Sequence, residues 1–165
     1  MIRIRSTACI DAPASRVWSR LCALEEIPLW SAPVLRATCP LGHNTGIGAQ
    51  RICALKGNLE IRESWSEWSN EQRYFKYEAE GIPLVKRASN RGSVHAHSPG
   101  QSLLISEAEV ELQGGGIARL LLEPLMEKRM IILGQQSLAA LKHLVETGHR
   151  FEGKYTDLPV PLHAC

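Results

Sequence analysis

The stretch from Ile117 to Thr147, IARLLLEPLMEKRMIILGQQSLAALKHLVET, decides the fold of this chain. Apolar residues recur along it at helical spacing, at Leu122, Met126, Met130, Leu133, Ala140 and Leu144. Such spacing predicts one long helix with an apolar stripe that another element must cover. Because strand-like segments precede this stretch, a curved sheet is the natural partner. The sequence therefore predicts a space between sheet and helix, and the function is expected to lie in that space.

Seven segments before the helix alternate apolar and polar residues, as strands with one buried face do. They are residues 1–10, 34–39, 49–55, 59–68, 73–80, 88–97 and 102–112. A short helix is expected after the first segment, where Asp11 can cap and Pro13 suits the first turn. Turns of hairpin length join the later segments. The sequence therefore predicts an α+β fold with six or seven antiparallel strands in one curved sheet.

No internal repeat, low-complexity segment or linker divides the chain. Residues 1–150 are therefore expected to form a single domain, and residues 151–165 an irregular C-terminal tail. Pro124 lies inside the pattern of the long helix, where proline removes a backbone donor and crowds the preceding turn. A kink or a break of the helix is expected there.

Charge and composition exclude several classes of function. The formal net charge is +2, with basic and acidic residues interleaved, so no nucleic-acid partner is predicted. No apolar run approaches the roughly 18 residues of a membrane-spanning helix, and the alternating N-terminus is unlike a signal peptide. The five cysteines form no CxxC pair and are expected to be reduced and mostly buried, as in a cytoplasmic protein. They are Cys9, Cys22, Cys39, Cys53 and Cys165.

Several local sequences resemble, in the expected order, the START-like superfamily with the helix-grip fold, also called SRPBCC. The matching segments are DAPASRVWSRL (11–21), IPLWSAPV (27–34), GAQRICAL (48–55), LEIRESWSEW (59–68), RYFKYEAEG (73–81) and LAALKHLVE (138–146). The resemblance covers about residues 3–147 and implies a hydrophobic cavity between the sheet and the C-terminal helix. Polyketide cyclase/dehydrase-like proteins and pollen-allergen relatives share this scaffold with unrelated ligands, so the resemblance implies a fold more than a function.

The alternation also predicts which side chains face the helix. Three carboxylates in the last strand belong in water, so Leu104, Ser106, Ala108 and Val110 are expected to face inward. We take the inward sets of three earlier strands as Ala49, Arg51 and Cys53, then Leu59, Ile61, Glu63 and Trp65, then Phe75, Tyr77 and Ala79. The wall is then apolar and aromatic with one cation and one anion, which is typical of a small-molecule site. Trp68, three residues after Trp65, is expected on the opposite face.

Arg51, Glu63 and Tyr77 are the candidate catalytic residues. Arg51 and Glu63 can orient a carbonyl or enol ligand, and Glu63 with a raised pKa can move a proton. The alternative is a structural ion pair between neighbouring strands. Tyr77 can donate its hydroxyl to a ligand or simply line the core. The candidate ligand-binding residues are Trp30, Arg51, Glu63, Trp65, Phe75, Tyr77, Val94, Ala108, Met126 and Met130. Trp30 can equally plug the junction of helix and sheet, and the two methionines can be plain core.

No metal site or cofactor is predicted. His95 and His97 share one face of a predicted strand, but a third ligand is missing and Val94 and Ala96 look like the buried set. No GxSxG, HExxH or phosphate-binding motif is present. We therefore expect binding, carriage or sequestration of a small hydrophobic or aromatic molecule. The alternatives are a polyketide cyclase or dehydratase using the same cavity and a surface interaction module, with homodimerisation left open.

Overall fold

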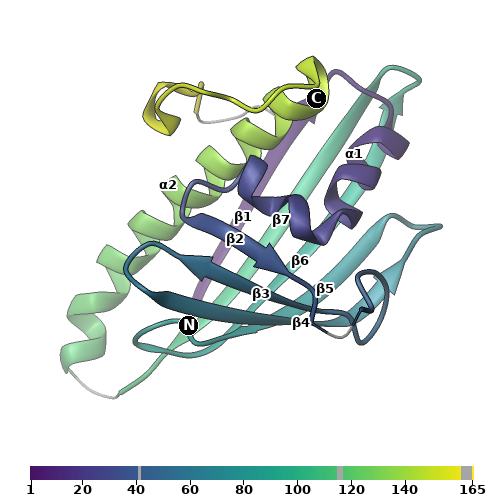
Figure 1. The fold of residues 1–165 in the computed structure, drawn as a ribbon. Helices are drawn as coiled ribbons and strands as arrows, with labels where there is room; N and C mark the ends of the chain where they lie inside the picture. The colour runs from purple at the N-terminus through teal and green to yellow at the C-terminus, as the bar shows by residue number, and fades with distance from the viewer. Residues whose placement is uncertain (41, 115–116, 161–164) are drawn as a thin grey trace.

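The computed structural model describes residues 1–40, 42–114, 117–160 and 165. Within these residues a sheet and a long helix form two layers, with a short helix at one end (Figure 1). The strands are β1 (Ile2–Ile10), β2 (Val34–Thr38), β3 (Gln50–Leu55), β4 (Leu59–Ser69), β5 (Tyr74–Glu80), β6 (Val85–Ser98) and β7 (Gln101–Leu112). The helical segments are α1 (Ala14–Cys22), η1 (Leu24–Leu29), α2 (Ile117–Thr147) and η2 (Tyr155–Asp157). The predicted α+β architecture with six or seven antiparallel strands is thereby confirmed, with seven strands observed.

The sheet is antiparallel, with the strand order β1-β7-β6-β5-β4-β3-β2. Strands β2 to β7 pair in chain order, whereas β1 pairs with β7, from Ile2 opposite Val110 to Ile10 opposite Ser102. The N-terminal strand therefore lies beside the last one, close to α2, which packs mainly against β1. On the side of β2 to β5 the helix leaves the inner face of the sheet less covered.

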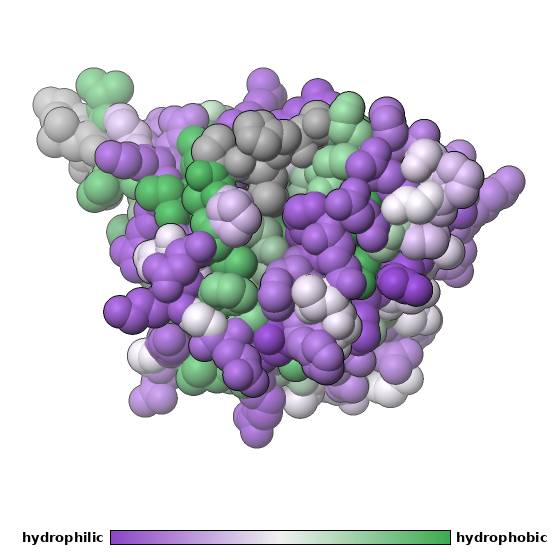
Figure 2. Space-filling view, turned by 90° about the horizontal axis from the view of Figure 1, so that it is seen from above, coloured by the Kyte–Doolittle hydropathy of each residue, from purple (hydrophilic) through white to green (hydrophobic). Residues whose placement is uncertain are grey.

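The long helix runs from Ile117 to Thr147 without interruption, so Pro124 does not break it. The predicted apolar stripe is covered only in part. Ala140 and Leu144 are buried, and Met126 and Met130 are partly buried, whereas Leu122 and Leu133 are 38% and 37% exposed. Hydrophilic side chains cover most of the face in Figure 2, and apolar ones gather at its left, over α2. The expectation that the whole stripe is covered is therefore wrong at Leu122 and Leu133.

The main core lies where α1 and the second half of α2 meet the sheet. Val17, Trp18 and Leu21 of α1 pack there with Leu138 and Leu141 of α2. The predicted capping role of Asp11 is wrong, because Pro13 is the N-cap residue and no side chain caps the helix. Asp11 instead accepts a hydrogen bond from Gln101, at 2.8 Å.

Trp65 and Trp68 lie on the same face of the sheet, contrary to the alternation expected from sequence. The pairing of β4 with β5 shifts between Trp65 and Glu67, as at a β-bulge, where one strand contributes an extra residue. The two indole rings consequently lie 6.4 Å apart, centroid to centroid. Both therefore belong to one aromatic cluster on the inner face.

The cysteines also differ from expectation. Cys9 and Cys165 form a disulfide, so the prediction that all five are reduced is wrong for this pair. Cys22, Cys39 and Cys53 are free thiols. Between Gly148 and the C-terminus, Phe151, Tyr155 and Leu158 pack against α2 and Trp30, so this part of the tail is attached to the fold.

Candidate ligand-binding cavity

A cavity of about 350 Å³ lies between the inner face of the sheet and α2. All seven strands contribute to its wall, β2 through Val34 alone. The rest of the wall comes from α1, from η1 with the residues that follow it, and from Met130 to Leu138 of α2. Most of these side chains are apolar, and a few hydroxyl, amide and charged groups interrupt them. This volume lies in the range of pockets that hold small organic molecules.

The strand alternation predicted from sequence is confirmed on the wall of this cavity. Arg51 and Cys53 of β3 and Ile61, Glu63 and Trp65 of β4 line it, as do Phe75, Tyr77 and Ala79 of β5 and Leu104, Ser106, Ala108 and Val110 of β7. The carboxylates between the β7 residues lie on the outer face, where Glu107 and Glu109 pair with Arg5 and Arg3. His95 and His97 are exposed, and so is Ala96.

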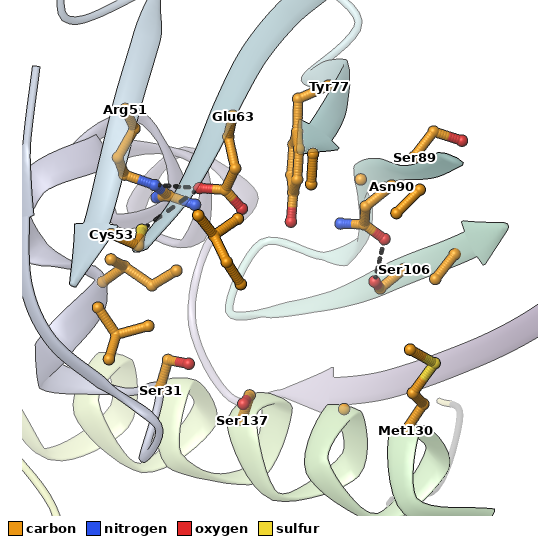
Figure 3. Close-up of a pocket in the computed structure, with 18 of the residues that line it drawn as sticks. Ser31, Arg51, Cys53, Glu63, Tyr77, Ser89, Asn90, Ser106, Met130 and Ser137 are labelled. Carbon is orange, nitrogen blue, oxygen red and sulfur yellow. Dashed lines mark hydrogen bonds and ion pairs between the residues drawn. The ribbon is translucent and has the colours of Figure 1, made fainter. Parts of the chain in front are cut away.

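Arg51 and Glu63 face each other across neighbouring strands and form a buried ion pair (Figure 3). Arg51 Nε donates to Glu63 Oε2 at 2.6 Å, and Arg51 Nη1 donates to the Leu24 carbonyl at 2.9 Å. The guanidinium also lies 5.1 Å from the centre of the Trp65 ring. Burial alone lowers the pKa of Arg51, but the charge and hydrogen bond of Glu63 outweigh burial and raise it. Arg51 therefore stays protonated in the interior.

Cys53 lies beside this pair, with its Sγ 3.5 Å from Glu63 Oε2. Burial first, and then the Glu63 carboxylate, raises the pKa of the Cys53 thiol to about 12. Because the thiolate is the reactive form of cysteine, Cys53 is unreactive near neutral pH. It contributes a small apolar surface to the cavity wall.

Tyr77 stands opposite the ion pair, with its hydroxyl toward the middle of the cavity (Figure 3). Burial, and next the charge of Glu63, raises the pKa of this hydroxyl well above its ordinary value. Tyr77 is therefore a neutral hydrogen-bond donor. Its partner in register on β6 is Asn90, whose Oδ1 accepts a hydrogen bond from Ser106 Oγ at 3.0 Å.

An aromatic cluster supports this wall. Trp65, Phe75 and Tyr77 contact one another, with ring centroids 4.9 to 6.4 Å apart. The ring of Phe75 lies directly over Gly92 of β6, where a Cβ atom would be 2.5 Å from Phe75 Cζ. Glycine is therefore needed at position 92 for the ring to lie against the strand. The cluster holds the Tyr77 ring in place.

Eight of the ten candidate ligand-binding residues line the cavity: Trp30, Arg51, Glu63, Trp65, Phe75, Tyr77, Ala108 and Met130. Val94 and Met126 do not. Val94 is 1% exposed in the main core, and Met126 packs beyond the cavity with Ile2 and Val85. Each faces the interior, as its spacing predicts, but spacing does not tell where along an element the cavity ends.

Several polar lining residues were missed: Ser6, Ser31, Asn90 and Ser137. Asn90 was accessible from sequence, because it shares strand parity with Val94. Ser137 was accessible as well, since it follows Met130 by seven residues and so lies on the same helix face. Ser31 follows η1 in an irregular segment and carries no periodic signal.

Two tryptophans, Trp30 and Trp65, line the cavity. Within the described part of the chain, their indole nitrogens are buried without a hydrogen-bond partner. Since these nitrogens have almost no accessible surface, the two residues contribute apolar ring surface to the wall and no donor. The sequence leaves two roles open for Trp30, as a ligand-binding residue or as a plug between helix and sheet. It both lines the cavity and packs against the C-terminal segment, so the two roles are compatible.

The chain belongs to the family described as polyketide cyclase / dehydrase and lipid transport, whose model matches residues 1–146. Its fold is similar to that of the ZhuI aromatase/cyclase from Streptomyces sp. R1128, with 15% identity, a TM-score of 0.68 and coverage of 88% of this chain and 96% of that one. The di-domain aromatase/cyclase BexL of the BE-7585A biosynthetic pathway is 19% identical, with a TM-score of 0.66 and coverage of 88% of this chain and 47% of that one. Norcoclaurine synthase from Thalictrum flavum, in complex with dopamine and hydroxybenzaldehyde, is 18% identical, with a TM-score of 0.65 and coverage of 87% of this chain and 85% of that one.

At these identities the structural matches establish the helix-grip fold and nothing more specific, and the resemblance seen in the sequence is confirmed at that level. No curated protein sequence matches this chain significantly. None of the helices in the described residues is both long and apolar enough to cross a membrane.

Proposed function

We propose that this protein binds a small hydrophobic or aromatic molecule in the cavity between sheet and α2, and so carries or sequesters it. The observation that supports this most is the cavity itself: about 350 Å³ of space in a wall that is mostly apolar. A filled core would leave no such space, because protein interiors pack as densely as organic crystals. Burial of apolar ligand surface, at roughly 25 cal/mol per Å², would drive binding.

The contacts proposed for the ligand are the eight candidate residues that line the cavity. The aromatic rings of Trp65, Phe75 and Tyr77 offer flat apolar surface, and Met130 offers an adaptable side chain from α2. Arg51, Glu63 and Tyr77 would set the orientation of the bound molecule. A location in the cytoplasm stays a prediction, and the Cys9–Cys165 disulfide weighs against a strongly reducing compartment.

Native mass spectrometry of freshly purified protein tests this proposal. We expect a small molecule to accompany the wild-type chain and to be absent from Ala79→Trp, which places an indole in the cavity. Glu78→Trp is the matched control, because Glu78 precedes Ala79 on β5 and is exposed on the other face. A co-purified molecule retained by Ala79→Trp would place binding elsewhere and contradict the proposal.

A polyketide cyclase or dehydratase activity is the second candidate. It is favoured by the neutral phenol of Tyr77 and by the ion pair in the same wall, since a placed donor and a carboxylate can handle protons. Glu63→Gln separates the candidates: loss of turnover with ligand affinity kept favours an enzyme, whereas an unchanged product profile favours binding alone. A surface interaction module, with or without homodimerisation, stays a prediction.

A further inference from the structure

The charges of the cavity wall bear on which ligands it accepts. Arg51 and Glu63 are the charged residues among the described lining, and they are paired with each other at 2.6 Å. An incoming carboxylate would have to compete with Glu63 for the guanidinium or lie in the apolar space without a counterion. Either choice is costly, because a buried charge needs a partner. The wall therefore disfavours anions.

A neutral hydrogen-bond donor remains available in the same wall. A tyrosine hydroxyl is protonated at neutral pH, and burial raises the pKa of Tyr77 further above that range. A ligand that offers an oxygen acceptor would satisfy this donor without bringing a charge into the cavity.

Asn90 determines which way the Tyr77 hydroxyl can act. Ser106 donates to Asn90 Oδ1, which leaves the amide nitrogen of Asn90 pointing toward the Tyr77 hydroxyl (Figure 3). An amide N–H donates and cannot accept, so it engages a lone pair of the phenolic oxygen. The phenolic hydrogen then remains free for a ligand. Asn90 is thus a positioning residue that acts through Tyr77.

We propose that the cavity selects neutral molecules bearing a carbonyl oxygen, and that Asn90 sets this preference by directing the Tyr77 hydroxyl hydrogen toward the ligand. This inference rests on the proposed binding function. It adds to that function a ligand class and a specificity residue. A carbonyl oxygen accepts from Tyr77 and brings no hydrogen of its own, whereas an alcohol brings an O–H that needs an acceptor in a mostly apolar wall.

Three probes with one naphthalene body test the ligand class: methyl 2-naphthyl ketone, 1-(2-naphthyl)ethanol and 2-naphthoate. We expect calorimetric titration of the wild-type protein to give the ketone an affinity about tenfold above that of the alcohol, a ratio typical of one unpaired hydrogen-bonding group. The naphthoate should bind more weakly than both. Equal affinity for the three, abolished by Ala79→Trp, would leave the binding cavity intact and overturn the ligand class. No binding of any probe would overturn both proposals.

Two variants test Asn90 itself. In Asn90→Asp the carboxylate accepts from both Ser106 and Tyr77, which consumes the phenolic hydrogen, so the alcohol should now bind more tightly than the ketone. Asn90→Leu removes the amide that orients the Tyr77 hydroxyl, so the affinities for the ketone and for the alcohol should become similar. Ser93→Ala is the matched control, since Ser93 is a small polar residue of the same strand that lies outside the cavity lining and whose hydroxyl contacts the exposed His95. An unchanged preference in Asn90→Asp, or a wild-type preference for the alcohol, would overturn the proposal.

Discussion

Removal of Glu63 from the ion pair is predicted to destabilise the protein strongly. In Glu63→Ala the guanidinium of Arg51 stays in the interior, 3% exposed, without its counterion. Breaking a buried ion pair in this way typically costs about 3–5 kcal/mol. Arg51 keeps its hydrogen bond to the Leu24 carbonyl and its contact with the Trp65 ring, so we expect the lower end, about 3 kcal/mol. For a chain of this size that corresponds to a decrease of the melting temperature of roughly 6–12 °C.

Urea unfolding measures this effect in Glu63→Ala and in a double-mutant cycle built from the single variants Arg51→Met and Glu63→Leu. The double variant Arg51→Met with Glu63→Leu removes both charges and fills the space with apolar atoms, so it should recover most of the loss. Glu109→Ala is the matched control, because its ion pair with Arg3 is exposed and such pairs contribute little. The reasoning is refuted if Glu63→Ala costs no more than Glu109→Ala, or if the double variant loses the sum of the two single losses.

Three further predictions concern the core and the thiols. Gly92→Ala should cost about 1–3 kcal/mol in urea unfolding because its Cβ meets an aromatic ring, whereas Gly100→Ala, whose Cβ meets nothing, should be neutral; equal effects would contradict this. Thiol titration of the denatured chain should find three free thiols before reduction and five after it, and five throughout would exclude the Cys9–Cys165 disulfide. The pKa of Cys53 is raised from the ordinary 9 to about 12 in the folded protein. The protonated thiol therefore contributes fully to the free energy of unfolding below pH 9, and this contribution is lost as the pH rises from 9 to 12. Cys53→Ala should reduce that loss, and an equal loss would contradict the assignment.

Periodic features of the chain predicted the fold well. The strand alternation identified the seven strands, and the helical spacing gave the bounds of the long helix. Because a strand places alternate residues on opposite faces, the same reasoning predicts Arg51, Glu63 and Tyr77 on one face, and the structure has all three on the cavity wall. The helical spacing of apolar residues and the alternation of strand faces are local properties, so they can be read from a sequence.

Features that depend on distant contacts could not be predicted. The shift in pairing after Trp65 turns Trp68 to the inner face, and nothing in the local pattern marks it. The Cys9–Cys165 disulfide joins residues 156 positions apart. Val94 and Met126 face inward as predicted but lie beyond the cavity, since its limits depend on how all the elements pack together.

The most direct test of the central claim is a crystal structure of the protein with methyl 2-naphthyl ketone. We predict electron density for the naphthalene rings between the sheet and α2, with the carbonyl oxygen within hydrogen-bond distance of the Tyr77 hydroxyl. A cavity filled by the protein's own side chains, or a ketone bound only on the outer surface, would contradict the claim that this protein is built around a binding site for small apolar molecules.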